Sequence, residues 1–72
     1  MAGKETIFEV VESPEGGYEA RALGESIFTQ ADSLQGLRDA VRDAVHCHWG
    51  DRMREMPAVI RLHFVHDEVI SA

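Results

Sequence analysis

The alternation of apolar and polar residues in the first half of the chain predicts three short β-strands. Residues 6–12 (TIFEVVE) are rich in β-branched and aromatic side chains, and they stop at the turn sequence Ser-Pro-Glu-Gly-Gly, residues 13–17. Residues 18–23 alternate again and predict a returning strand. Residues 24–25 (Gly-Glu) are expected to form a two-residue turn into a third strand, residues 26–31. The three segments together predict an antiparallel meander.

The period of the pattern then changes to that of an amphipathic helix of about four turns. Asp32 or Ser33 can cap its first turn, and Gly50 is a natural stop at its end. Residues 51–57 predict a loop, and residues 58–66 (AVIRLHFVH) predict a fourth strand. The apolar stripe of the predicted helix contains Leu34, Leu37, Ala40, Val41, Ala44, Val45 and His48.

The predicted element order is therefore β-β-β-α-β, an α+β fold in which one helix covers one face of a four-stranded sheet. The other face carries more apolar residues than a face fully exposed to water should. On the fourth strand, for example, the residues pointing to each side of the sheet include apolar ones. This surplus predicts self-association, to which we assign Val59, His63, Val65 and Trp49. For Trp49 two roles remain open, a clamp between helix and sheet or an anchor for a partner.

Composition limits what such a fold can do. The chain has 72 residues, which indicates one domain, 1–72, with flexible ends at 1–5 and 67–72. A chain this short buries about 60% of its unfolded surface, and a single cysteine cannot form an internal disulfide, so help from a second chain is expected. The net charge of −6 argues against direct binding to nucleic acid or to a membrane surface. No targeting or spanning segment is evident, and we expect a cytoplasmic protein.

The side chains that could carry chemistry do not form a recognisable site. His46 and His48 point about 200° apart on a helix, and His63 and His66 fall on opposite faces of a strand, so we expect no metal and no cofactor. Cys47 lies late in the helix, where a thiolate is disfavoured, and is expected to be structural. Known catalytic motifs are absent, which predicts a protein that is not an enzyme. The alternative is a small hydrolase or metal-dependent protein that uses these four histidines.

Acidic residues are concentrated in the N-terminal half. Residues 1–36 carry seven acidic and two basic side chains. A surface of this kind favours a basic protein partner, because complementary charge steers association. The predicted partner-binding residues are Glu9, Glu12, Glu15, Glu19 and Glu25.

Several of these segments resemble the HicB-like antitoxin family. Residues 8–18 (FEVVESPEGGY) are similar to the family's hairpin, and Thr29, Asp32 and Ser33 match its entry into the helix. Ala31 stands where the family usually has Gly, and residues 36–37 (Gly-Leu) stand where an acidic residue and Ala are usual. The run VIRLHFVHDEV after Ala58 looks still more like a subgroup of short stand-alone HicB-like proteins of bacteria.

The resemblance implies a β-β-β-α-β fold and a homo-oligomer. In full antitoxins of this family, the domain binds a basic HicA ribonuclease toxin, and a separate C-terminal module binds operator DNA. The chain reaches residue 72 soon after the fourth strand, so no DNA-binding module is expected here. The expected function is that of a non-catalytic, antitoxin-like interaction module that self-associates and binds a basic partner such as a HicA-like toxin.

Overall fold

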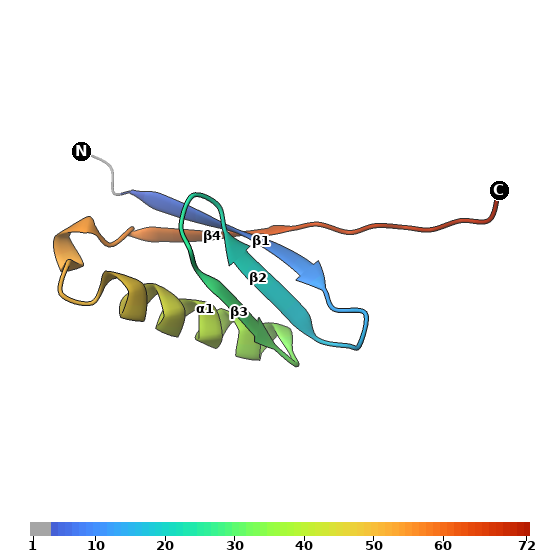
Figure 1. Cartoon of the computed structure of the whole chain (residues 1–72), viewed down its shortest axis with the longest axis horizontal. Helices are drawn as coiled ribbons and strands as arrows, with labels where there is room; N and C mark the ends of the chain where they lie inside the picture. Colours follow the sequence, from blue (N-terminus) through green and yellow to red (C-terminus); the bar gives the residue numbers. More distant parts are fainter. Residues whose placement is uncertain (1–3) are drawn as a thin grey trace.

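The protein, seen in a computed structural model that describes residues 4–72, consists of a four-stranded sheet with one long helix against one face (Figure 1). The elements are β1 (Glu5–Glu12), β2 (Tyr18–Ala22), β3 (Phe28–Ala31), α1 (Leu34–Trp49), the 3-10 helix η1 (Met53–Glu55) and β4 (Val59–Phe64). The predicted α+β fold and element order are confirmed. Of the predicted flexible N-terminal end, residues 1–3 lie outside the described residues, and Glu5 already belongs to β1.

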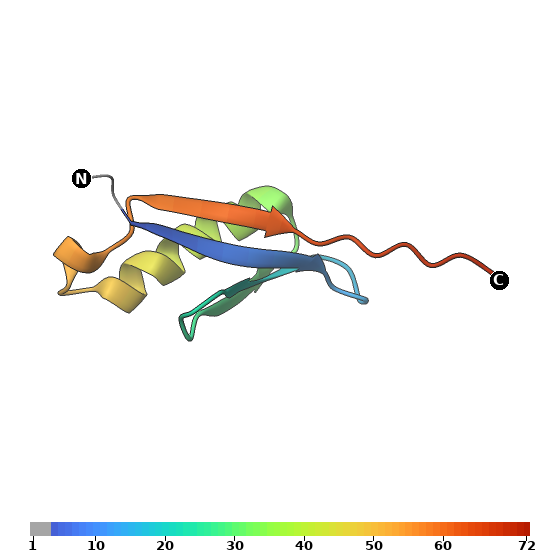
Figure 2. The ribbon, with the colours of Figure 1, turned by 90° about the horizontal axis from the view of Figure 1, so that it is seen from above.

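The strand order in the sheet is β3-β2-β1-β4. The first three strands form the predicted antiparallel meander. The fourth returns after α1 and lies parallel to β1 at the edge, with Thr6 opposite Ile60 and Phe8 opposite Leu62. A parallel neighbour requires a crossover of a dozen or more residues, which the helix supplies. Figure 2 shows β4 beside β1, with the C-terminal residues continuing as an arm beyond the body.

The β1–β2 turn depends on two glycines with positive φ, Gly16 at 99° and Gly17 at 83°. The Ser13 N–H donates to the Gly17 carbonyl oxygen at 3.0 Å and closes the turn. A Cβ on Gly17 would lie 2.7 Å from the carbonyl oxygen of Ala31, so this turn packs closely against the end of β3. A side chain at position 17 is therefore expected to strain the turn.

The connection between β2 and β3 differs from the expected two-residue turn. It spans residues 23–27, and the Ala22 N–H donates across its base to the Ile27 carbonyl oxygen at 2.9 Å. Ile27 lies in this loop and is only 6% exposed. A two-residue turn would have placed it in a regular strand, whereas the longer loop lets its side chain enter the core.

Helix α1 begins at the residue after Ser33, whose Oγ accepts a hydrogen bond from the Gly36 N–H at 3.0 Å. Ser33 is therefore the N-cap, which the sequence left open between two residues. At the other end the Gly50 N–H donates to the His46 carbonyl oxygen at 2.8 Å. The buried residues of the helix recur every four positions: Leu37, Val41, Val45 and Trp49.

The core lies between this helical stripe and one face of the sheet. The sheet side of the core contains Phe8, Val10, Ala20, Ala22 and Ile27. Trp49 is only 7% exposed and packs in the same cluster. It is thus the clamp between helix and sheet, and our assignment of Trp49 to self-association is wrong, because a buried side chain offers a partner almost no surface.

Candidate protein-binding surfaces

The face of the sheet opposite α1 mixes apolar and charged side chains. Pairing in the sheet places directly opposed residues on the same face, so the register defines this open face. Its apolar members in the strands are Ile7, Val11, Phe28 and Val59, and its charged or titratable members are Glu5, Glu9, Glu19, Arg21, Arg61 and His63. Val65, just after β4, continues the row of Val59 because its N–H donates to the Val10 carbonyl oxygen at 2.9 Å. The predicted self-association residues other than Trp49 all lie on this face.

One ion pair on the open face is well formed. The Arg61 guanidinium donates to Glu5 Oε2 through Nη2 at 2.8 Å and through Nε at 3.1 Å. These hydrogen bonds, together with the positive charge, hold the pKa of the Glu5 carboxyl below its ordinary value of 4.5. Glu5 is therefore compensated and adds little to an acidic surface.

The structure divides the five predicted partner-binding glutamates. Glu9 and Glu19 project from the open face on neighbouring strands. Glu12 and Glu15 lie at the β1–β2 turn. Glu25 lies at the other end of β2, where its Oε2 is 3.6 Å from His48 Nε2. The prediction of one acidic surface from all five is wrong, because β1 and β2 are long enough to hold their two ends apart.

Three acidic residues do lie close together at the β1–β2 turn. We call this group the acidic turn; it consists of Glu12, Glu15 and Asp32. Asp32 joins it because the link from β3 to α1 passes beside the β1–β2 turn. An open hollow of about 440 Å³ lies there, lined in part by Glu15, Tyr18 and Asp32. Within residues 4–72, no Lys or Arg forms an ion pair with these three carboxylates. Their charge is therefore available to a partner.

The four histidines occupy separate places. His48 is half-buried with its ring 4.6 Å from the ring of Trp49, His46 is exposed on the helix, and His63 belongs to the open face. His66 follows β4, with Nδ1 3.9 Å from Glu12 Oε1. In the described part of the chain, no three His, Cys, Asp or Glu residues lie close enough together to hold a metal ion.

Cys47, predicted to be a structural thiol, is exposed and does not belong to the core. It follows His46 on the outer side of α1, while the core positions are taken by Val45 and Trp49. The four-residue spacing of the buried stripe leaves position 47 facing away from the sheet.

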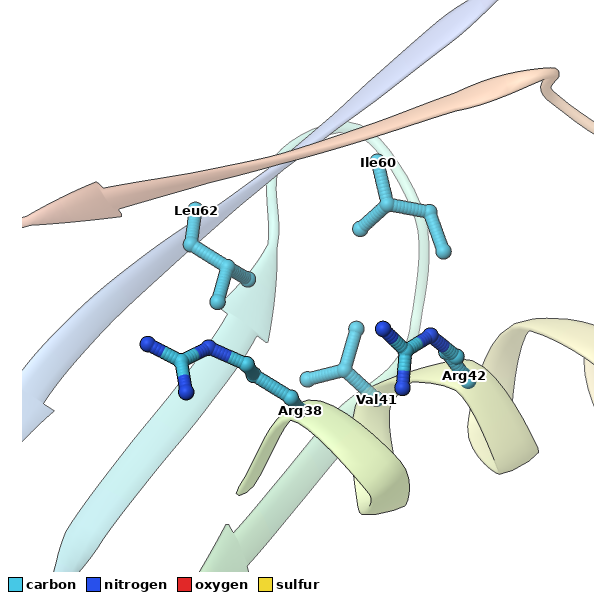
Figure 3. A pocket seen from close by; sticks show the side chains of 5 residues that line it. All are labelled: Arg38, Val41, Arg42, Ile60 and Leu62. Atoms are coloured by element: carbon cyan, nitrogen blue, oxygen red, sulfur yellow. The ribbon is translucent and has the colours of Figure 1, made fainter. Parts of the chain in front are cut away.

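A second hollow lies between α1 and β4. Helix α1 packs mainly against β2 and β3, so it leaves the helix-side row of β4 partly open. Figure 3 shows Ile60 and Leu62 pointing from β4 towards Val41 on the helix, with Arg38 and Arg42 on either side. We call this feature the α1–β4 groove; its volume is about 240 Å³.

The groove and its two arginines were not predicted from the sequence. Both arginines are exposed on the side of the helix next to β4. The available signal was the apolar row of β4, which continues from Ile60 and Leu62 to Phe64. A single helix that packs mainly on β2 and β3 covers this row only in part, through Val41.

No helix in residues 4–72 is both long enough and apolar enough to cross a membrane. The fold and surfaces instead define a small α+β protein whose distinctive features are an open sheet face, an acidic turn and an apolar groove with a basic rim.

Comparison with known proteins places the chain in a family. It is 38% identical over 68 residues to a UPF0150 protein of Thermotoga maritima, which covers 94% of this chain and 93% of that protein. It is 56% identical over 45 residues to a UPF0150 protein of Archaeoglobus fulgidus, covering 62% of this chain and 68% of that one. The chain belongs to the UPF0150 family. No family model matches it, and no solved structure does.

Proposed function

We propose that this UPF0150 protein is a non-catalytic, HicB-like interaction module that self-associates and binds a basic protein partner, such as a HicA-like ribonuclease toxin. The observation that carries the proposal is the acidic turn. Two of its carboxylates, Glu15 and Asp32, line an open hollow, Glu12 lies at the same turn, and no Lys or Arg in residues 4–72 is paired with any of the three.

Such a site suits a Lys or Arg side chain of a partner. The hollow combines carboxylates with the half-buried Tyr18 and the polar Gln30, so it can accept hydrogen bonds from a cation and contact its apolar stem. The net charge of −6 adds long-range steering of a basic chain.

Self-association is supported by the open face. Phe28 is 54% exposed and Val59 is 48% exposed, and with Val65 they lie on the face that α1 does not cover. A small domain gains stability when a second chain covers such residues.

The test is binding to a short basic chain encoded beside this gene, produced together with it and measured by titration calorimetry. Exchanging Glu12 and Glu15 for Lys should weaken binding at least about tenfold, and raised salt should weaken the wild-type complex. Exchanging Asp43 and Asp51 for Lys makes the same charge change away from the turn and should have a much smaller effect.

Equal losses in the two double variants would show that only net charge matters and would reject the acidic turn. Co-purification from the native cell with mass spectrometry tests the proposal as a whole. A protein that is monomeric at micromolar concentration and that brings down no basic chain would overturn it.

A further inference from the structure

Strand β4 exposes a free edge. The N–H groups of Val59 and Val65 donate inwards, to the carbonyl oxygens of Lys4 and Val10 at 3.2 and 2.9 Å. Backbone groups alternate sides along a strand, so those of Ile60, Leu62 and Phe64 point away from β1. On that side the described chain supplies no neighbouring strand. An edge of this kind is a template for another extended segment.

The side chains beside this edge also lack a cover. Ile60 and Leu62 form the floor of the α1–β4 groove, and Arg38 stands at its rim (Figure 3). Phe64, the next residue of the same row, is 51% exposed. A segment paired with β4 would therefore meet an apolar floor and a positive rim.

The C-terminal arm has the complementary chemistry. Residues 65–72 continue the line of β4 away from the body (Figures 1 and 2). Val69 is 94% exposed and Ile70 is 77% exposed. Asp67 and Glu68 immediately precede them, so the arm presents two acidic residues followed by two apolar ones.

The arm is poorly placed to reach the edge of its own β4. It would have to reverse direction at residues 65–67 (Val-His-Asp), and the tight two-residue hairpins use Gly or Asn where φ is positive. The arm of a second copy needs no such turn, because it can approach the edge of β4 in an extended conformation.

We propose that residues 65–70 of a second copy lie antiparallel along the free edge of β4, and that the exchange is reciprocal about a twofold axis at Val65. The inference rests on the self-association in the proposed function and places the contact at the free edge of β4 and the α1–β4 groove, not across the open face. In this register Ile70 of one copy faces Ile60 of the other, and Glu68 faces Leu62.

The register satisfies both backbone and side chains. Even-numbered residues direct their backbone groups to the free edge on both copies, so they form the hydrogen-bonded pairs. The same residues project on the helix side. Ile70 therefore covers the groove, and Glu68 comes beside Arg38 at its rim.

Sedimentation velocity across micromolar concentrations tests the interface. We expect a wild-type dimer whose dissociation constant rises on the order of a hundredfold in Ile70→Asp, because two isoleucines per dimer lose their apolar contact. Ser71→Asp adds the same charge one residue later and on the opposite face, and should shift the constant much less. Equal shifts, or a wild-type monomer, would overturn the inference.

Charge exchange gives a more specific test on exposed residues. Glu68→Arg and Arg38→Glu should each weaken the dimer about tenfold, since each brings like charges together. The double variant restores opposite charges and should recover most of the loss. Additive losses in the double variant would reject the pairing of Glu68 with Arg38.

A cross-link tests the register. In a Cys47→Ser background, Val65→Cys should form an intermolecular disulfide, because directly opposed residues in a non-hydrogen-bonded pair lie about 4.5 Å apart. Phe28→Cys in the same background should remain reduced. The opposite result would place the interface on the open face near β3, which would reject arm exchange while leaving the proposed self-association intact.

Discussion

Truncation of Leu37 measures how much of this small fold rests on the stripe of α1. Leu37 is fully buried and packs in the cluster of Phe8, Val41 and Trp49. Leu→Ala at a buried position costs about 2–5 kcal/mol, from the lost transfer free energy and the cavity that remains. Domains of this size have a total stability of roughly 4–11 kcal/mol, so Leu37→Ala removes a large part of it.

The matched control is the same substitution at Leu23, which is 52% exposed. Leu23→Ala should cost about 1 kcal/mol or less, because half of the side chain is already in water. Urea denaturation followed by circular dichroism, at one fixed protein concentration, gives both values, since association links stability to concentration. In thermal denaturation, Leu37→Ala should lower Tm by at least about 10 °C.

Similar costs at the two leucines would refute the reasoning. That result would mean that the open side of the molecule is as well covered as the core in solution, or that α1 does not pack on the sheet as described. A loss at Leu37 below about 1 kcal/mol would contradict the assigned burial directly.

Three further predictions concern the turn, the cap and one ion pair. Gly17→Ala should destabilise the fold more than Gly16→Ala in urea denaturation, because both have positive φ but only Gly17 would press a Cβ against the Ala31 carbonyl; equal losses would contradict the close approach. Ser33→Ala should lower the free energy of unfolding by about 1 kcal/mol and reduce the helical circular dichroism signal near the transition. Ser33→Asp should retain most of the stability. An alanine variant as stable as wild type would contradict the role of Ser33 as the N-cap. Because the pKa of Glu5 is lowered in the folded state, its contribution is present above the ordinary value of 4.5 and is lost as the pH falls below it. The stability difference between wild type and Glu5→Gln should therefore shrink in acid, and a difference that grows as pH falls would contradict the sign.

Local patterns predicted the elements well because each depends on neighbours in sequence. The strands at residues 6–12 and 58–66 and the long helix follow from side-chain period, and the turn at residues 13–17 follows from its glycines. The two-residue turn at Gly24 was wrong because the burial of Ile27 in the core extends the loop, and no local pattern records that contact.

The candidate surfaces were predicted less well, since each joins distant segments. Val59 and His63 were placed correctly on the open face, because alternation in one strand decides that. The five glutamates were not, because their distances depend on which ends of β1 and β2 they occupy. Asp32 joins the acidic turn only through the packing of Gly17 against the end of β3.

The sequence by itself determined the type and order of the strands and the helix, most of the buried stripe of the helix, and that the chain carries excess negative charge. Only the tertiary structure decided that β4 lies at the edge, parallel to β1, and that Trp49 fills the core. The reason is physical: period and turn chemistry act over a few residues, whereas strand order and the width covered by one helix depend on contacts between segments far apart. Those contacts leave the edge of β4 and the α1–β4 groove open.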